Sequence, residues 1–424
     1  MELAPPRGTQ DLLPGRADAM LGLYEEAHRL ARLFGFRYVE TPTFEHTELF
    51  ARTSGDTSDV VTKEMYTFQD KGGRSLTLRP ESTASVVRAY LEHAHDLGTP
   101  FTCYYVATEF RHSRPQAGRL REFRQFGIEV IGVEGPAADV EVIALGQQYV
   151  RDRGLTDVAL HLNSIGDPEC RPAYRELLVA YFQPYLEQLD ADCRARLQKN
   201  PLRVFDCKVD GRKDFVLAAP TIAEHLCEAC AAHFAGVRAG LDEAGIAYEL
   251  DPRLVRGLDY YTRTAFEWIV GSLAAAQATV NAGGRYDGLA EELGGPPTPG
   301  VGFAMGLDRV LLAMQAEGAP LGEIRSPRCF VVTIGDEARR AGGDLVGELR
   351  AAGISAATAY EERPLKAQLK MADRASAAFV AILGERELAE GSVTIRRLVD
   401  GIQKAIPATD VVKWLMRLDE WGEA

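Results

Sequence analysis

The sequence predicts an α+β protein: an antiparallel sheet flanked by helices, with a helical insertion and a small C-terminal α/β domain. Three features of the hydrophobic pattern support this fold class. Between residues 36 and 132, short strand-like runs follow one another with one convincing helix among them, which is typical of an antiparallel sheet rather than of βαβ units. From about residue 167 to 233 the apolar residues recur with helical spacing, and after residue 327 strand and helix patterns alternate.

The N-terminal region begins with a helix. Apolar residues recur at intervals of three and four between Arg16 and Phe34, which predicts a helix with one buried face, and Gly35 ends it. The strands expected next cover residues 36–39, 75–78, 102–107 and 126–132, and the helix among them covers residues 82–97.

The hydrophobic pattern changes twice in the middle of the chain. Within the predicted insertion, residues 174–182 place their large apolar side chains on one helical face. Strand-like runs return at 247–250 and 265–270. The Gly-rich stretch Asn281–Leu289 leads into Gly294–Met314, where Gly and Pro stand in front of an apolar helical run. This pattern predicts a loop followed by a strand and then a helix.

The C-terminal region, residues 328–424, predicts a separate α/β domain, so that residues 1–327 form the first domain. Its expected strands are 330–334, 356–359 and 379–383, and its expected helices are 337–352 and 364–376. Asp400-Gly401 predicts a hairpin with a two-residue turn between strands at 393–399 and 402–406.

Charge and cysteine content narrow the functional class. The chain has 48 Lys and Arg against 61 Asp and Glu, a net charge of −13, which argues against non-specific coating of nucleic acid. The C-terminal domain is nearly neutral, which is compatible with a local RNA contact. Seven cysteines, no apolar run of about 20 residues and no signal-like N-terminus lead us to expect a cytoplasmic protein with no membrane segment.

Arginines are the candidate phosphate ligands. The chain contains no G-x-x-x-x-G-K-[ST] loop, and its glycines near residue 302 miss the dinucleotide spacing, so a bound nucleotide needs other cations. Arg111–Arg124 holds five arginines and one acid around a turn between two strands, from which planar guanidinium groups can grip a phosphate. A solvated basic hairpin is the alternative, and the spacing does not decide between the two.

Two further clusters have a functional and a structural interpretation. Arg256, Tyr260 and Tyr261 crowd a turn before a strand, where they can bind a polar heterocycle or simply pack. Glu81 stands at the start of a predicted helix beside two hydroxyl residues, Ser82 and Thr83, where the group can hold an ammonium or only cap the helix.

Three cysteines and a histidine are candidate zinc ligands. Cys227 and Cys230 form a C-x-x-C pair, with His233 after it and Cys207 before it. Only one such pair occurs, and its sequence CEACAAHF follows a helical pattern in which cysteines pack well. We therefore assign no metal ligand from the sequence.

Taken in order, these segments resemble the histidyl-tRNA synthetase family of class II aminoacyl-tRNA synthetases along nearly the entire chain. RGTQDLLP opens the resemblance, and YVETPTFE around Pro42 is similar to the first class II motif, which in the family builds a dimer interface. FRHSRPQAGRLREFRQFGIEVIG is similar to the second motif and GFAMGLDR to the third. LVRGLDYY and AGGRYDGL resemble the two signatures that distinguish the histidine enzymes.

The resemblance implies roles for individual residues. Those expected at the histidine α-amino group are Glu81, Thr83 and Gln125, and those expected around the imidazole are Glu129, Tyr261 and Tyr286. Ser82 and Tyr260 complete the expected histidine site. The residues expected to act on the α-phosphate and carboxylate are Arg111 and Arg256, and Arg309 is expected at the ATP γ-phosphate.

The implied reaction joins histidine to tRNA(His) through a histidyl-adenylate, with ATP as substrate, Mg²⁺ as its companion, and a homodimer as the working form. Residues 328–424 are then an anticodon-binding domain. The alternatives are a non-catalytic paralogue, the ATP phosphoribosyltransferase regulatory subunit, or an RNA-binding module on the same fold. Such regulatory subunits lack the C-terminal domain and tend to lose the arginines, whereas this chain has both.

Three positions depart from the family pattern. Ser113 stands where the second motif usually has a Glu that faces adenine, Ser82 replaces a Gly, and Ala117 replaces a Lys. We expect a weaker side-chain contact to the base and slightly less basic character near the RNA end. None of the three is assigned to the chemistry of the reaction.

Overall fold

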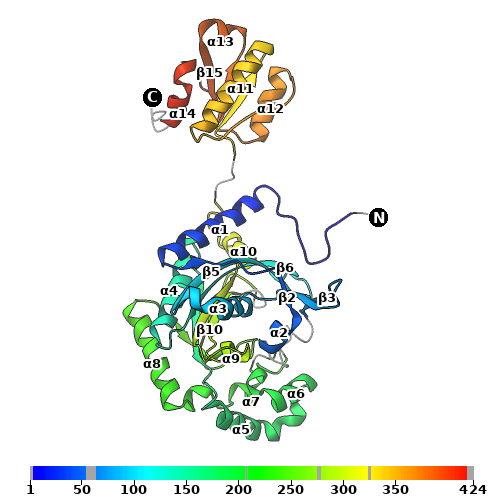
Figure 1. Ribbon diagram of the computed structural model, residues 1–424, viewed down its shortest axis with the longest axis vertical. Coiled ribbons are helices and arrows are strands. Elements are labelled where there is room, and N and C mark those ends of the chain that lie inside the picture. Colours follow the sequence, from blue (N-terminus) through cyan, green and yellow to red (C-terminus); the bar gives the residue numbers. More distant parts are fainter. Residues whose placement is uncertain are drawn as a thin grey trace. The chain divides into compact units, whose positions relative to one another are not determined.

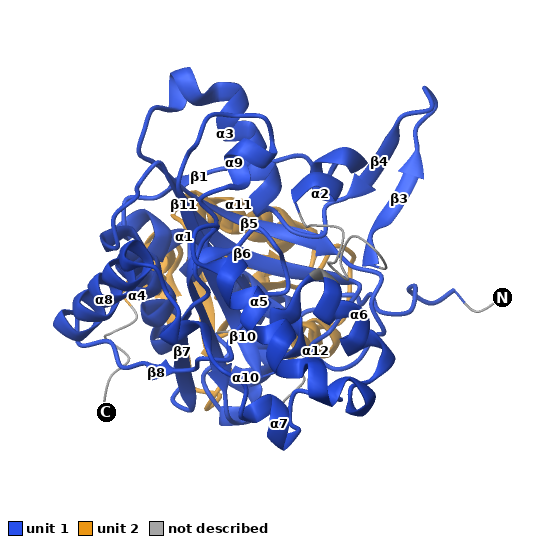
Figure 2. Ribbon diagram, turned by 90° about the horizontal axis from the view of Figure 1, so that it is seen from below, with its two compact units in different colours: residues 1–323 blue, residues 324–424 orange. Residues whose placement is uncertain are grey.

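A computed structural model describes residues 3–53, 64–205, 207, 209–274, 278–322 and 326–417. The chain divides into two compact units, Met1–Glu323 and Ile324–Ala424, coloured separately in Figure 2. Our sequence-based boundary after residue 327 differs slightly from this division, and the extent of each functional domain stays a prediction. Each unit has its own sheet and its own hydrophobic core.

An eight-stranded sheet forms the centre of unit 1. Its strands, in spatial order, are β1 (Arg37–Tyr38), β5 (Phe101–Phe110), β6 (Glu122–Ile131), β11 (Gly300–Gly306), β10 (Thr279–Arg285), β9 (Thr262–Val270), β7 (Val158–Ser164) and β8 (Glu249–Leu250). The six central strands pair antiparallel, as predicted, whereas the two short outer strands pair in parallel. The sheet is therefore mixed at its edges only.

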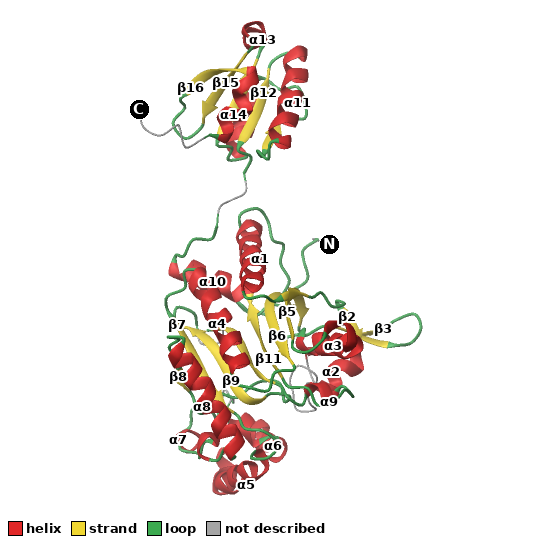
Figure 3. Ribbon diagram, turned by 60° about the vertical axis from the view of Figure 1, so that its left-hand side comes forward, coloured by secondary structure: helices red, strands yellow, loops and turns green. Residues whose placement is uncertain are grey.

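Four long helices cover one face of this sheet: α1 (Arg16–Leu33), α4 (Ala137–Asp152), α8 (Glu228–Glu243) and α10 (Leu307–Glu317). In α1 the apolar stripe predicted from the sequence is buried, and Leu23 and Leu30 pack with Phe126, Trp268 and Phe303 of the sheet in one cluster. This large apolar core fixes the strands rigidly, because burying each large side chain contributes about 1.5–3 kcal/mol. Figure 3 shows α4 and α10 against the strands.

The other face carries smaller elements. Its helices are α2 (Thr47–Thr53), α3 (Thr83–Leu97) and α9 (Leu289–Glu292). A separate three-stranded sheet has the order β2 (Phe44–His46), β4 (Ser75–Leu78), β3 (Tyr66–Gln69). The predicted strand at 75–78 is confirmed as a strand, but it belongs to this small sheet. The face is incompletely covered, which leaves room for a cavity.

The predicted insertion is helical in the part that the structure describes. Its helices are α5 (Arg171–Phe182), α6 (Ala191–Lys199) and α7 (Asp214–Leu217), joined by the 3₁₀ turns η2 (Gln183–Gln188), η3 (Pro201–Val204) and η4 (Ile222–Glu224). They gather at one end of unit 1 (Figure 1) around a core that includes Tyr174, Leu178 and Phe182. The periodicity at 174–182 therefore marked a genuine buried face.

The loop predicted to begin at Asn281 is wrong, because residues up to Arg285 form the end of β10. The glycines are needed by the strand itself. A Cβ at Gly283 would lie 2.2 Å from the carbonyl oxygen of Gly302, and one at Gly284 would lie 2.5 Å from that of Thr264. Glycine in a strand can mark such close backbone approach as well as a turn.

Unit 2 has a five-stranded sheet in the order β13 (Ala356–Thr358), β12 (Cys329–Thr333), β14 (Phe379–Leu383), β15 (Ser392–Arg397), β16 (Gln403–Pro407). Its helices are α11 (Asp336–Ala351), α12 (Leu365–Arg374), α13 (Glu385–Glu390) and α14 (Val411–Met416), and a 3₁₀ turn, η5 (Ala408–Asp410), precedes the last. The α/β prediction is confirmed.

The two-residue turn predicted at Asp400-Gly401 is wrong. The Arg397 N–H donates to the Ile402 carbonyl at 2.9 Å, so residues 398–401 all lie in the turn. The Asp400 carboxylate accepts the Ile402 N–H at 3.1 Å, and Gly401 has a φ of +74°. Asp-Gly therefore ends a longer turn here rather than forming the whole of a short one.

No single described helix is long and apolar enough to cross a membrane, although one pair of segments, Asp214–Glu224 and Glu228–Glu243, bent by 94°, meets the length and composition limits together.

Candidate active site

A cavity of about 430 Å³ opens on the incompletely covered face of the large sheet. Its floor comes from β6, β9, β10 and β11, and its walls come from the start of α3 and from the loops around residues 111–121 and 256–261. The predicted site residues in its lining are Glu81, Thr83, Arg111, Gln125, Arg256, Tyr260, Tyr261 and Arg309. Four segments far apart in the sequence thus converge on one space.

Glycines in the sheet make room for the large polar side chains at this site. A Cβ at Gly302 would lie 1.9 Å from Glu129 Oε2, and one at Gly300 would lie 2.1 Å from the Tyr286 ring. Gln125 and Glu129 share a face of β6 because alternate strand residues point the same way. The Gly-rich sequence that we interpreted as a loop therefore shapes the site.

Glu81 anchors one end of the cavity. Its carboxylate accepts the backbone N–H groups of Thr83 at 2.9 Å and Ala84 at 3.0 Å, and the Tyr260 hydroxyl lies 3.4 Å from Oε2. The helix-cap interpretation of Glu81 is thus confirmed, and the same carboxylate also faces the cavity. Burial raises the pKa of Glu81, although these N–H groups and Arg111 oppose that change.

Glu129 lies behind Thr83 and is fully buried. It accepts the Thr83 hydroxyl at 2.8 Å and the Tyr286 hydroxyl at 2.5 Å. Burial raises the pKa of Glu129 to about 8, against the opposing effect of these two hydroxyls. Neither Glu129 nor Tyr286 belongs to the described cavity wall, so their contact with a ligand stays a prediction.

Ser82 also points away from the cavity. Its hydroxyl donates to Glu109 Oε1 at 2.6 Å, and Arg79 Nε lies 3.6 Å from the other carboxylate oxygen of Glu109. Burial raises the pKa of Glu109 to about 8, and the charge of Glu81 adds to that effect. Glu109 could not be predicted from the sequence, because a single acid in the strand FTCYYVATEF gives no signal of its own. Of the three buried acids, Glu81 lines this end of the cavity, and Glu109 and Glu129 lie outside its lining.

Two arginines that line the cavity carry the basic character of the site. Arg111 Nε donates to the Pro80 carbonyl at 2.8 Å, and its guanidinium lies 5.2 Å from the Phe123 ring centre. Arg309 Nε donates to the Gly118 carbonyl at 2.9 Å. Burial, together with the nearby charges of Arg111 and Arg119, lowers the pKa of Arg309. In the part of the chain that the structure describes, neither Arg111 nor Arg309 pairs with a carboxylate.

Arg256 is held by residues that the sequence analysis did not single out. Its Nη1 lies 3.2 Å from Glu267 Oε2, and its guanidinium lies 5.6 Å from the Tyr261 ring centre. Arg203, in the helical insertion, donates to the Arg256 carbonyl at 2.9 Å. Only the fold brings Glu267 and Arg203 to this loop.

Three ion pairs form the remaining charged wall. Arg119 lies 2.7 Å from Glu64, and Arg124 lies 3.5 Å from Asp308, whose Oδ2 accepts the Arg124 backbone N–H at 2.8 Å. Ser113, which departs from the family pattern, also lines the cavity, and its hydroxyl has no hydrogen-bond partner among the residues that the structure describes. The third pair is Arg256 with Glu267.

Cys207 and His233 do not join Cys227 and Cys230 in one cluster. His233 Nε2 lies 3.4 Å from Asp139 and 3.2 Å from Arg285 Nε, within the buried core. Two other clusters of potential metal ligands form among the described residues. The first is Asp167, Cys170, Cys227 and Cys230, and the second is Asp190, Cys193, Cys207 and Asp210. Neither lines the cavity.

Family models, curated relatives and solved structures all match this chain to the same family. Residues 8–310 match the family described as "Histidyl-tRNA synthetase", and residues 328–418 match "Anticodon binding domain". The chain is 50% identical to the histidine–tRNA ligase of Moorella thermoacetica over 98% of this chain and 99% of the relative, and 46% identical to that of Desulforamulus reducens over 97% and 98%. The crystal structure of apo S. aureus histidyl-tRNA synthetase is 38% identical, with a TM-score of 0.83 over 98% of this chain and 100% of that one.

Proposed function

Because the chain belongs to the histidyl-tRNA synthetase family, a family of class II aminoacyl-tRNA synthetases that ligate histidine to tRNA(His), we propose that histidine and ATP react in the cavity described above. The ligation uses ATP and passes through a histidyl-adenylate. Relatives that match over the full length are histidine–tRNA ligases, so the non-catalytic paralogue is not favoured.

The charge distribution of the cavity is the observation that supports this assignment most strongly. Among the described residues, the lining carboxylate Glu81 has no cation partner, Glu64, Glu267 and Asp308 pair with arginines, and Arg111 and Arg309 have no carboxylate partner. Histidine bears an ammonium and ring N–H groups, whereas ATP bears a chain of anionic phosphates. The two substrates therefore match the two ends.

At the acidic end, Glu81, with Thr83 and Gln125, receives the α-ammonium group. Glu129 and Tyr261 face the imidazole, and Tyr286 holds Glu129 through the hydroxyl bond at 2.5 Å. An amino acid without ring N–H groups leaves these buried polar groups unpaired, at about 1–3 kcal/mol each.

Two further residues hold the carboxylates at this end. Tyr260 contacts Glu81, and Ser82 acts through Glu109. Their proposed roles are to position the carboxylates rather than to touch the substrate.

At the basic end, the histidine carboxylate attacks the α-phosphorus and pyrophosphate leaves. Negative charge builds on the phosphoryl oxygens during this step, and Arg111 and Arg256 are the fixed cations proposed to stabilise it. Arg309 is proposed to hold the γ-phosphate. No protein nucleophile is required, because alignment of the two substrates supplies much of the rate.

Mg²⁺ is proposed to accompany ATP and to neutralise part of its phosphate charge. Among the described residues, the lining carboxylates Glu64, Glu267 and Asp308 already form ion pairs, and Glu81 accepts two backbone N–H groups. The chain therefore suits an ion held mainly by phosphates and water, which is how Mg²⁺ commonly binds.

Three further assignments are proposals of the same kind. Residues 328–424, which include the match to an anticodon-binding family, are proposed to read tRNA(His). A homodimer is supported by two half-exposed aromatic residues that pack together, Phe44 within the YVETPTFE segment and Phe68. A cytoplasmic location is supported by the cysteines, since all seven are free thiols.

ATP–pyrophosphate exchange tests the amino-acid assignment. The full-length protein is assayed with each of the twenty amino acids in turn. Histidine alone is expected to stimulate exchange, and comparable stimulation by a non-imidazole amino acid would contradict the proposed pocket.

A further inference from the structure

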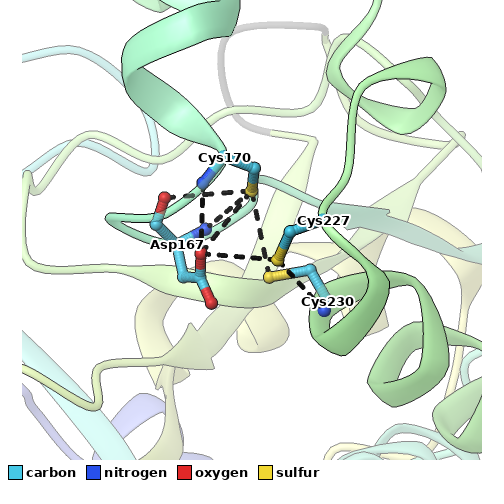
Figure 4. A group of neighbouring side chains, drawn as sticks. All are labelled: Asp167, Cys170, Cys227 and Cys230. Carbon is cyan, nitrogen blue, oxygen red and sulfur yellow. Dashed lines mark hydrogen bonds between the residues drawn. The ribbon is translucent and has the colours of Figure 1, made fainter.

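Two short motifs with the same spacing mark the beginning and the end of the helical insertion. Asp167-x-x-Cys170 precedes α5, and Cys227-x-x-Cys230 begins α8. Figure 4 shows their side chains converging. We propose that Asp167, Cys170, Cys227 and Cys230 bind a structural zinc ion that fastens the insertion to the catalytic sheet.

The spacing of the four ligand atoms supports zinc. They all lie within 4.8 Å of one another. Cys170 Sγ lies 3.9 Å from Cys230 Sγ, and Asp167 Oδ1 lies 3.6 Å from Cys170 Sγ and 3.8 Å from Cys227 Sγ. With Zn–S near 2.3 Å, tetrahedral geometry places two sulfurs about 3.8 Å apart, and a sulfur and an oxygen about 3.6 Å apart.

These distances exclude a disulfide as the explanation. The S–S bond is about 2.05 Å long, much shorter than the separation of Cys170 and Cys230, and all the cysteines are free. Cys170 and Cys230 are buried, and Cys227 and Asp167 are half-buried. The site is thus largely closed to solvent, which is typical of structural rather than catalytic zinc.

The backbone prepares the sulfurs as ligands. The Asp167 N–H points at Cys170 Sγ at 3.4 Å, and the Cys230 N–H points at Cys227 Sγ at 3.5 Å. Cys170 and Cys227 are the N-cap residues of α5 and α8. The Glu169 N–H donates to Asp167 Oδ1 at 3.0 Å and orients that oxygen.

Nearby arginines offset the charge of the ligands. Three thiolates and one carboxylate carry more negative charge than one zinc ion neutralises. Arg263 Nε lies 3.6 Å from Asp167 Oδ2, on the side away from the sulfurs, and Arg171 follows Cys170 directly. Arg171 also donates to the Ile165 carbonyl at 2.9 Å and to the Tyr261 carbonyl. The ion would therefore fix a residue that holds the proposed histidine pocket.

The second cluster, Asp190 with Cys193, Cys207 and Asp210, does not support the same conclusion. Lys213 Nζ lies 2.6 Å from Asp210 Oδ1, and the Asp190 N–H donates to Asp210 Oδ2 at 2.8 Å, so both oxygens of that carboxylate are occupied. In the first cluster, Arg263 approaches Oδ2 of Asp167, and Oδ1 faces the sulfurs. The proposal is limited to the first cluster, and the experiment is designed to assign the metal to it.

Metal content tests the proposal directly. The untagged full-length protein is produced in zinc-supplemented medium, gel-filtered without chelator, and analysed by elemental mass spectrometry. Cys227→Ser and Cys230→Ser are compared with Cys329→Ser, a buried cysteine of unit 2 that belongs to neither cluster. Each cluster variant should lose about one zinc per chain relative to wild type, whereas the Cys329 variant should lose none.

A spectroscopic readout covers the case in which a variant does not fold. Wild-type protein refilled with Co²⁺ should show sulfur-to-cobalt charge transfer and the strong visible bands of a tetrahedral site. Folded wild type that takes up neither zinc nor Co²⁺ would overturn the proposal. Unchanged zinc content in the Cys227 and Cys230 variants would also overturn it.

Discussion

Replacement of Arg256 by alanine tests the proposed chemistry most sharply. The side chain is 16% exposed and links Glu267 to the ring of Tyr261 at the edge of the cavity. Alanine removes the guanidinium without touching the strands beneath it. We expect the protein to stay folded and to lose most of its ability to form histidyl-adenylate.

The size of the loss follows from two effects. Loss of one fixed donor to a developing oxyanion typically lowers kcat by about 10²–10³-fold. The substitution also leaves Glu267 without its partner at 3.2 Å, so an uncompensated carboxylate faces the incoming phosphates. We therefore expect kcat/KM for exchange to fall by about 10²–10⁴-fold.

The effect on stability is expected to be much smaller. Both side chains line the cavity, so water can solvate the Glu267 carboxylate once the guanidinium is gone, and loss of the pair costs about 1 kcal/mol. The melting temperature should fall by no more than about 2–4 °C, as for a change of that size in a domain of a few hundred residues.

The assay is histidine-dependent ATP–pyrophosphate exchange, with thermal unfolding measured on the same samples. The double variant Arg256→Ala/Glu267→Gln removes the stranded carboxylate, so it should recover part of the ATP KM but little of kcat. Exchange within threefold of wild type in the folded single variant would refute the role given to Arg256.

Three further changes extend the test. Gly302→Ala should abolish histidine-dependent exchange, because its Cβ would lie 1.9 Å from Glu129 Oε2, whereas Gly343→Ala, with open space around its Cβ, should leave exchange unchanged. Burial raises the pKa of Glu129 to about 8, so its carboxylate is mostly protonated at pH 7. The KM for histidine should therefore fall several-fold between pH 7 and 8.5, as the carboxylate ionises. A Glu129→Gln variant with the same pH dependence would count against this. Deletion of the residues after Pro327 should spare exchange but impair charging of tRNA(His), and loss of exchange in a remnant folded by circular dichroism would contradict separate roles.

Hydrophobic periodicity predicted the elements that bury a continuous face. The helix from Arg16 was predicted correctly because its apolar side chains recur on one buried face, and the strand at 379–383 because it is a continuous apolar run that is buried along nearly its whole length. The strand at Asn281–Arg285 was not predicted, because glycine is common both in loops and in strands that pass close to another backbone. The length of the turn at Asp400 was also predicted wrongly, because the dipeptide Asp400-Gly401 does not fix the register of the two strands that it joins.

The site could be predicted only where a motif carried the information. Arginines and tyrosines in dense runs marked Arg111, Arg256 and Tyr261, and the structure places all three at one cavity. Glu109 and Glu267 left no signal, because each acts through a neighbour that only the folded sheet supplies.

The cysteine cluster shows how a signal can be present and still be overlooked. Asp167-x-x-Cys170 repeats the spacing of Cys227-x-x-Cys230, but Asp is too common a residue to attract notice. The sequence analysis grouped Cys207 and His233 with the C-x-x-C pair instead, and the fold separates both from it.

A crystal structure of the protein with histidinol and an unreactive ATP analogue would test the central claim most directly. We predict the amino group at Glu81, the imidazole toward Glu129, and the phosphates against Arg111, Arg256 and Arg309. Phosphates bound at the carboxylate end, or arginines turned away from them, would contradict the account.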